Sequence, residues 1–242
     1  MMRFKGKKFK IAAVIGGLVL AVLVFLVSPV FHIQNVAVQG NSRVDRLDIE
    51  ERLGLNATSN ILLLNTNAAR RRIMGNLYIG DVAFTRELPG HLVVTVFERR
   101  PSAYVEHMGS FLVLDDFGRV LEVQSYKREI LPLLEGLQFS RWNLGEVLDV
   151  VNAVDFSNVV LYTQLLVNYG LIHDISHINV ADPSNIRILV NYLEFHVGGI
   201  ADADEKVRTI VAMLDNLPDA GRTRGYVNLR DIRPQFNLNL LQ

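Results

Sequence analysis

The first pattern along the chain is an apolar run from Ile11 to Phe31 that contains no charged residue. A helix of about 21 residues reaches about 30 Å, which is the thickness of the hydrocarbon core of a bilayer. Five Lys or Arg side chains and no acid precede the run, and cationic flanks stay in the cytoplasm during insertion. The pattern predicts a cytoplasmic tail over residues 1–10, a single transmembrane helix over residues 11–31, and an extracytoplasmic remainder.

A cleaved secretory signal would share the basic start. Its apolar region is usually shorter, however, and a small-residue cleavage site follows it. The stretch from Val27 to Phe31 offers no such site, so we favour an uncleaved anchor. Ala12 with Gly16 and Ala13 with Gly17 form small-x-x-x-small pairs, which leave open whether the helix pairs with another helix in the membrane.

Periodicity over residues 32–99 predicts the order strand, helix, helix, strand, strand. Asp45 caps the first helix and Gly54 closes it, while Asn67 is expected to cap the second. The last two strands cover residues 78–86 and 91–99, and Pro89-Gly90 between them predicts a type II turn. Both faces of the last strand are apolar, which places it inside a sheet or close to another domain.

Residues 100–233 predict a second domain that mixes helices and strands, so the fold class is α+β. Expected strands cover residues 103–106, 111–114, 119–123, 175–180, 185–190, 193–197 and 226–230, with one helix within 151–169 and one after Asp202. The last helix is the clearest, because Val207, Ile210, Val211 and Leu214 repeat at helical spacing. Residues 234–242 carry no turn signal and read as a tail that is mobile or packs against a partner.

Charge and cysteine content narrow the class of protein. The net charge is zero, but the first ten residues hold five of the 25 Lys and Arg and none of the 25 Asp and Glu. The remainder is therefore acidic, which argues against nucleic acid as a partner. The absence of cysteine excludes disulfides, cysteine-based zinc sites and thiol catalysis.

Candidate chemical motifs are better explained as structure, so we predict no catalytic, metal or cofactor site. Asp116-Phe117-Gly118 spells a kinase magnesium motif, but the rest of that machinery is missing, which favours a hairpin turn. His173 and His177 have zinc-site spacing without the Glu of H-E-x-x-H, and the acids of residues 202–205 suit the first turn of a helix. The three arginines of residues 70–72 read as a solvated surface, and Glu98, Arg99 and Arg100 as ion pairs across a domain junction.

Several short motifs together resemble one family. They are Phe31-His32-Ile33-Gln34-Asn35-Val36, Val38-Gln39-Gly40-Asn41, Leu88-Pro89-Gly90, Glu98-Arg99-Arg100-Pro101, the hairpin of residues 111–121, Leu131-Pro132-Leu133-Leu134-Glu135-Gly136 and Gly225-Tyr226-Val227-Asn228-Leu229-Arg230. Their order resembles the bacterial cell-division family FtsQ/DivIB, with a POTRA domain over residues 32–99 and an FtsQ-type C-terminal domain over 100–233. Asn228 stands where the family usually has Asp.

The resemblance implies a non-enzymatic divisome protein of the cell membrane and the division septum. It would bind FtsB-like and FtsL-like single-pass proteins and help to control septal peptidoglycan synthesis by FtsW and FtsI. The family arrangement implies that a partner strand adds to a sheet edge formed by Tyr226, Val227, Asn228, Leu229 and Arg230. By alternation, Tyr226, Asn228 and Arg230 share one face, whereas Val227 and Leu229 hold the strand on its domain.

Two other classes of protein stay open. The first is a POTRA-containing envelope protein for polypeptide export or assembly, although such a protein normally has several POTRA units or a barrel. The second is an extracytoplasmic enzyme of wall metabolism, which the missing catalytic constellation disfavours.

Overall fold

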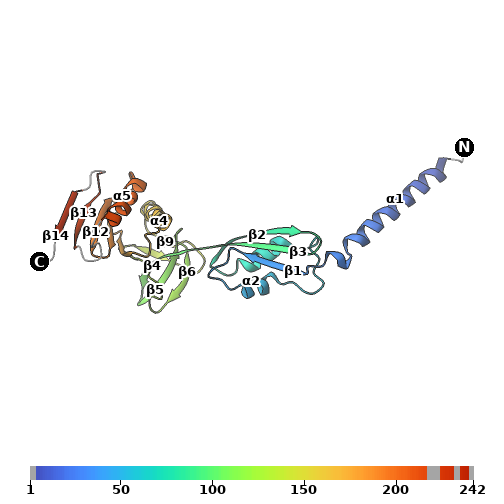
Figure 1. The fold of residues 1–242 in the computed structure, drawn as a ribbon, viewed down its shortest axis with the longest axis horizontal. Helices are drawn as coiled ribbons and strands as arrows, with labels where there is room; N and C mark the ends of the chain where they lie inside the picture. Colours follow the sequence, from blue (N-terminus) through green and yellow to red (C-terminus); the bar gives the residue numbers. More distant parts are fainter. Residues whose placement is uncertain (1–3, 217–223, 232–234, 240–242) are drawn as a thin grey trace. The chain divides into compact units, whose positions relative to one another are not determined.

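The computed structural model describes residues 4–216, 224–231 and 235–239, with side chains omitted at positions 4–12, 153–155 and 235–239. The chain divides into two compact units, Met1–Glu98 and Arg99–Gln242. Figure 1 shows the elements of each unit. We describe each unit by itself.

The apolar run forms helix α1, Phe4–Leu26, and a 3-10 turn η1 follows at Pro29–Phe31. The predicted span to Phe31 was too long, because proline cannot continue a helix and Ser28 caps the next turn instead. Phe31 is 9% exposed and belongs to the core of the N-terminal unit. Among the described residues, no helix is both long enough and apolar enough to cross a membrane.

The rest of the N-terminal unit confirms the predicted order strand, helix, helix, strand, strand. These elements are β1 Asn35–Gln39, α2 Arg46–Leu53, α3 Thr66–Ile73, β2 Ile79–Glu87 and β3 His91–Glu98. The sheet order is β1-β3-β2, with β3 parallel to β1 and antiparallel to β2, so β3 is the central strand as its two apolar faces predicted. Both helices pack on one face through Ile49, Leu53, Ala69 and Ile73.

Local signals set most element ends in this unit. The Asp45 side chain accepts from the amide of Leu47, and Gly54 closes α2 with a φ of 66°. The cap of α3 is Asn65, not Asn67, and its side chain accepts from the amide of Ala68. Gly90 does not have the positive φ that the second central position of a type II turn requires, so the predicted type II turn was wrong.

Glu98 closes the N-terminal unit at the end of β3. Its carboxylate accepts hydrogen bonds of 2.8 to 3.2 Å from the amides of Ser42, Arg43 and Val44 and from the Ser42 hydroxyl. Burial alone would raise the pKa of Glu98, but these hydrogen bonds outweigh burial and hold the pKa below its usual value. The predicted pairing across the domain junction was wrong for Glu98, and also for Arg99, which pairs with Asp115 inside the C-terminal unit at 3.3 Å.

The lowered pKa of Glu98 gives a pH-dependent prediction. Glu98→Gln should lower the free energy of unfolding at pH 7 by about 1–2 kcal/mol, because charge-assisted hydrogen bonds to three amides are weakened. The carboxylate stabilises the fold above its unfolded-state pKa, and this contribution is lost as pH falls through the lower folded-state pKa. Urea unfolding of residues 27–242 at pH 7 and at pH 3 should therefore show a smaller difference between wild type and variant in acid. An equal difference at both pH values would contradict this role.

The C-terminal unit is built on a nine-stranded sheet in the order β14-β13-β12-β11-β10-β7-β4-β5-β6. Its strands are β4 Pro101–His107, β5 Ser110–Asp115, β6 Val120–Gln124, β7 Leu133–Glu135, β10 Ile175–Asn179, β11 Ile186–Val190, β12 Leu193–Gly198, β13 Arg224–Asn228 and β14 Gln235–Asn239. A separate two-stranded sheet joins β8, Phe139–Arg141, to β9, Asp149–Val150. The strands predicted within residues 103–197 are confirmed to within a few residues.

Helices α4, Ala153–Asn168, and α5, Ala203–Asn216, cover one face of the large sheet (Figure 1). Tyr162 of α4 and Lys206 of α5 both reach the end of β12, where the Tyr162 hydroxyl and the Lys206 ammonium donate to the carbonyl of Gly199 at 2.8 and 3.3 Å. Lys206 also donates to the carbonyl of Val197 at 2.8 Å. These bonds fix the strand against which β13 pairs. The opposite face of β10 to β13 carries no helix among the described residues, and we call it the open face.

Candidate interaction site at the C-terminal end of the sheet

The site predicted at residues 226–230 lies in β13, which has a neighbour on each side. It runs parallel to β12, with Tyr226 opposite Glu194, and antiparallel to β14, with Tyr226 opposite Asn237. The expectation that this strand forms the sheet edge was therefore wrong. Residues 235–239, expected to belong to a tail, form the end strand instead, and their polar and apolar residues alternate as in a strand.

The apolar side chains of this segment anchor β13 on its unit. Val227 and Leu229 are 0% and 1% exposed and belong to the main core beneath α4 and α5. Leu229 lies one residue beyond the strand, and its amide donates to the carbonyl of His196 at 2.9 Å. The prediction that Val227 and Leu229 face the core and anchor the strand is confirmed by their burial.

Tyr226 lies on the open face and is 42% exposed. Its ring stacks on that of His196, with centroids 5.1 Å apart and planes 17° apart. His196 Nε2 lies 3.6 Å from one oxygen of Glu194, and the other oxygen pairs with Arg187 at 3.3 Å. Arg187, Glu194, His196 and Tyr226 thus form one connected group, which we call the open-face cluster.

Two polar atoms of the open-face cluster lack a hydrogen bond within the described part of the chain. These shielded atoms are His196 Nε2, whose contact with Glu194 is longer than a hydrogen bond, and Arg187 Nε. Sequence reasoning missed this cluster. The alternation of buried and half-buried residues in β11 and β12 identifies the outward positions, but only the sheet order places them beside Tyr226.

Asn228 and Arg230 stabilise the end of β13. The Asn228 side-chain oxygen accepts from the amide of Arg230 at 3.1 Å, and the guanidinium of Arg230 donates to the side-chain oxygen of Asn185 at 2.5 Å. The stem of Arg230 lies against Gly198, where an added Cβ would come within 3.1 Å of it. Arg230 therefore links the end of β13 to β12 and to the turn before β11.

The register defines which backbone groups of β14 face outward. The amide of Leu229 faces β12, and residues two apart in a strand face the same way, so the amides of Tyr226 and Asn228 face β14. Their partners, Asn237 and Gln235, face back toward β13. The amides of Phe236 and Leu238 consequently point away from the sheet. β14 is the last strand in the described sheet, so this row of donors and acceptors is available to an added strand.

The other candidate motifs have structural roles. Asp115, next to the kinase-like triplet, accepts from the amides of Phe117 and Arg119 and so closes the β5–β6 turn. His173 Nδ1 donates to the carbonyl of Ile130 at 2.9 Å, whereas His177 Nε2 lies 3.6 Å from Glu135. Within the described residues, no group of three or more His, Cys, Asp or Glu side chains is placed to hold a metal ion.

The charged runs also have partners within the fold. Asp204 pairs with Arg208 and accepts from the Tyr169 hydroxyl, as suits the first turn of a helix. Arg70 pairs with Asp81 on β2. Arg72 donates to the carbonyls of Arg52 and Leu53 at 3.0 and 2.5 Å, which caps the end of α2.

Comparison with known proteins finds sequence likenesses that extend over both units. Residues 31–99 match the family model for the FtsQ-type POTRA domain. The chain is 25% identical to the cell division protein DivIB of Clostridium tetani over 203 residues, which cover 83% of this chain and 77% of that protein. It is also 25% identical to DivIB of Clostridium botulinum over 230 residues, covering 93% of this chain and 89% of that protein.

Two further likenesses cover shorter parts of the chain. The cell division protein FtsQ of Bradyrhizobium diazoefficiens is 30% identical over 107 residues, which are 44% of this chain and 31% of that protein. The solved extracytoplasmic domain of the trans isomer of DivIB from Geobacillus stearothermophilus covers 50% of this chain at 21% identity, with 98% of its own length matched and a TM-score of 0.31. The chain is thus similar in sequence to bacterial cell-division proteins of the FtsQ/DivIB family, and its residues 31–99 match the FtsQ-type POTRA domain.

Proposed function

We propose that this chain is a non-enzymatic, single-pass membrane protein of the division septum that binds FtsB-like and FtsL-like proteins. Through them it helps to control septal peptidoglycan synthesis by FtsW and FtsI. The division role follows from the family, whose members are named as cell division proteins. The anchor is supported by the charge-free run after a basic N-terminus.

The observation that carries the binding mechanism is the outer edge of β14, which has no neighbouring strand among the described residues. A partner segment that adds as a strand there gains backbone hydrogen bonds to Phe236 and Leu238, whose amides point outward. Because the anchor holds the chain in the same membrane as single-pass partners, their effective concentration is raised. A weak edge contact is then sufficient for assembly.

Residues 226–230 support this edge in our proposal. Val227 and Leu229 fix β13 to the core, and Asn228 with Arg230 secures its end. Tyr226, stacked on His196, presents an exposed ring to a partner that continues over the open face. Aromatic side chains of this kind are frequent anchors at protein interfaces.

Two experiments test this function. A fluorescent fusion of the full chain should form a midcell band in dividing cells, and the chain should co-purify with FtsB-like and FtsL-like proteins of the same organism. A uniform envelope signal would contradict a septal role. Failure of both partners to co-purify from cells that make all three proteins would contradict the proposed binding.

A further inference from the structure

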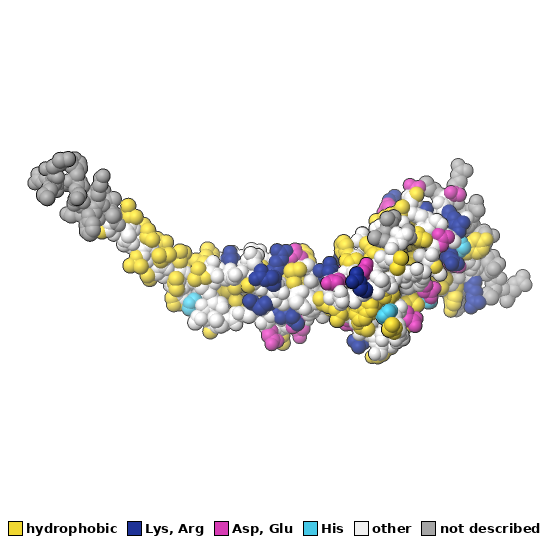
Figure 2. All heavy atoms as spheres, turned by 180° about the vertical axis from the view of Figure 1, so that it is seen from behind, with side chains coloured by type: hydrophobic (Ala, Val, Ile, Leu, Met, Phe, Trp, Pro, Cys, Tyr) yellow, Lys and Arg dark blue, Asp and Glu magenta, His cyan; other side chains and the backbone are white. Residues whose placement is uncertain are grey.

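The end of the N-terminal unit next to α1 carries exposed apolar side chains. Val27 and Val30 are 62% and 53% exposed, Leu63 in the loop before α3 is 65% exposed, and Leu88 in the β2–β3 turn is 58% exposed. We call these four residues the proximal apolar patch. Figure 2 shows hydrophobic side chains along the described part of α1 and at its junction with this unit. Exposed apolar patches of this kind mark interaction or membrane-contact sites.

Backbone hydrogen bonds tie together the three segments that carry the patch. The amide of Ile61 donates to the carbonyl of Phe31 at 2.9 Å, and the amide of Gln34 donates to the carbonyl of Gly90 at 2.8 Å. The loop that bears Leu63 and the turn that bears Leu88 are therefore fixed to the residues that leave α1.

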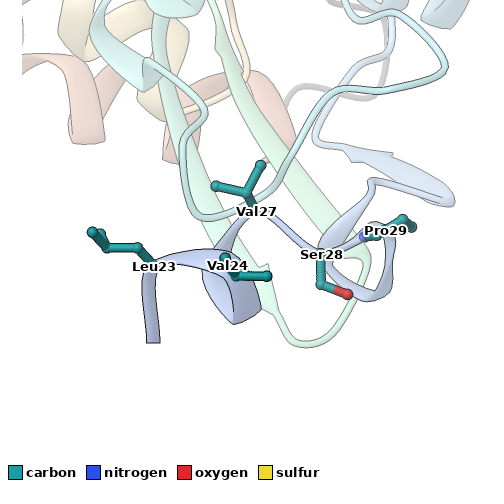
Figure 3. Close-up of a pocket in the computed structure, with 5 residues that line it drawn as sticks. All are labelled: Leu23, Val24, Val27, Ser28 and Pro29. Atoms are coloured by element: carbon teal, nitrogen blue, oxygen red, sulfur yellow. The ribbon is translucent and has the colours of Figure 1, made fainter. Parts of the chain in front are cut away.

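The end of α1 is itself bonded to the unit. The Asn60 side-chain amide donates to the carbonyl of Leu26 at 2.9 Å, and the ring of Phe25 meets that of the buried Phe31 edge-on, with centroids 5.3 Å apart. An open, mainly apolar hollow lies at this junction (Figure 3), lined by Leu23, Val24, Val27, Ser28 and Pro29. The helix thus enters the unit without a free linker.

We propose that the proximal apolar patch rests in the interfacial layer of the bilayer that α1 enters, so that the POTRA domain is held on the membrane surface. This inference rests on the proposed anchor. Lipid is the expected occupant because the patch continues the apolar anchor, and the chain from Ile11 to Asn35 contains no Asp, Glu, Lys or Arg. Amphipathic segments on a membrane surface bury their apolar side chains at the boundary of headgroups and acyl chains, and the patch would do the same.

The charge near the patch predicts how this contact depends on lipid. Arg86 and Glu87 precede Leu88 and carry opposite charges, and Arg86 donates to the carbonyl of Leu64 at 3.0 Å. Apolar contact rather than attraction to anionic headgroups therefore governs docking. We expect it to be insensitive to salt and to the content of anionic lipid.

Leu47 gives a matched control site in the same unit. Strand β3 runs about 24 Å from the β2–β3 turn to Glu98. Glu98 binds residues 42–44, directly before α2. Leu47, near the start of α2, is 70% exposed and lies toward the end of the unit opposite the patch.

The test uses the full chain in phosphatidylcholine vesicles, with and without phosphatidylglycerol. The chain has no cysteine, so Leu63→Cys, Leu88→Cys and Leu47→Cys each accept a single nitroxide label. Relaxation by oxygen, which concentrates in the bilayer, is compared with relaxation by a water-soluble nickel chelate. We expect the oxygen-to-nickel ratio at positions 63 and 88 to be at least threefold that at 47, with or without phosphatidylglycerol.

Flotation of the vesicles and binding of partner segments separate the possible failures. Equal ratios at positions 47, 63 and 88 in a chain that floats with the vesicles and binds its partners would overturn the docking inference alone. A chain that does not float with the vesicles would overturn the anchor and the docking together. A ratio that rises at 63 and 88 only with phosphatidylglycerol would contradict the apolar mode of contact.

Discussion

Replacement of Phe236 by proline should weaken binding of the FtsB-like partner by about thirtyfold. The Phe236 amide points away from β13, so proline removes a donor that an added strand would use and leaves the partner's carbonyl unpaired. Such a loss costs about 2 kcal/mol, which corresponds to that change in Kd. Titration of the purified chain with the partner segment measures the effect.

The free protein should keep its fold in this variant, because proline is tolerated on an edge strand where the N–H faces solvent. Phe236→Ala is the matched control, since it changes the same side chain and keeps the amide. Asn237→Pro is the second control. It removes an amide that faces β13, so it should lower the stability of the β13–β14 pair as well as binding.

Equal affinity of the partner for Phe236→Pro and for wild type would rule out strand addition at this edge. If residues 226–230 formed the edge, proline at Val227 or Asn228 would be the natural test. Proline at these positions does not test strand addition at β14. Both residues lie in an internal strand of the sheet, so proline there would disturb the chain's own ladder.

Local signals in the sequence predicted most elements because caps and alternation depend on near neighbours. Asp45 and Gly54 mark the ends of α2 as expected. The cap of α3 was misplaced because Asn65 and Asn67 both suit an N-cap, and local sequence does not choose between them. The choice of Asn65 accompanies the burial of Ala69 and Ile73 against the sheet, which is a tertiary effect.

The order of the nine-stranded sheet was beyond local reasoning. β12 pairs with β13 across the whole of α5, and β7 pairs with β10 across α4, so these contacts join segments far apart in the chain. The open-face cluster depends on this order, since His196 and Tyr226 meet only when β12 and β13 are neighbours. Glu98 is a similar case, because its amide partners at residues 42–44 are more than 50 residues away.

The candidate site was predicted in part. The inward direction of Val227 and Leu229 followed from alternation and is confirmed by their burial. The expected edge at residues 226–230 is wrong because residues 235–239, which lack a turn signal and were expected to form a tail, form the strand β14 outside them. Their alternation of Gln, Asn and Asn with Phe and Leu was the signal for β14. Whether residues 226–230 bind a partner stays a prediction.

The central claim, strand addition at β14, also predicts a pattern of amide hydrogen exchange. In the free chain the amides of Phe236 and Leu238 face no strand of the described sheet, whereas those of Gln235 and Asn237 face β13. An added strand would form hydrogen bonds with the amides of Phe236 and Leu238, and not with those of Gln235 and Asn237. Protection should therefore rise at alternate residues, which neither general tightening of the domain nor contact through side chains would produce.

The most direct measurement is residue-resolved hydrogen exchange of the chain with and without a saturating FtsB-like segment. We expect amide exchange at Phe236 and Leu238 to slow at least tenfold on binding, while exchange at Gln235 and Asn237 changes much less. Bound partner with unchanged exchange at Phe236 and Leu238 would contradict strand addition at this edge.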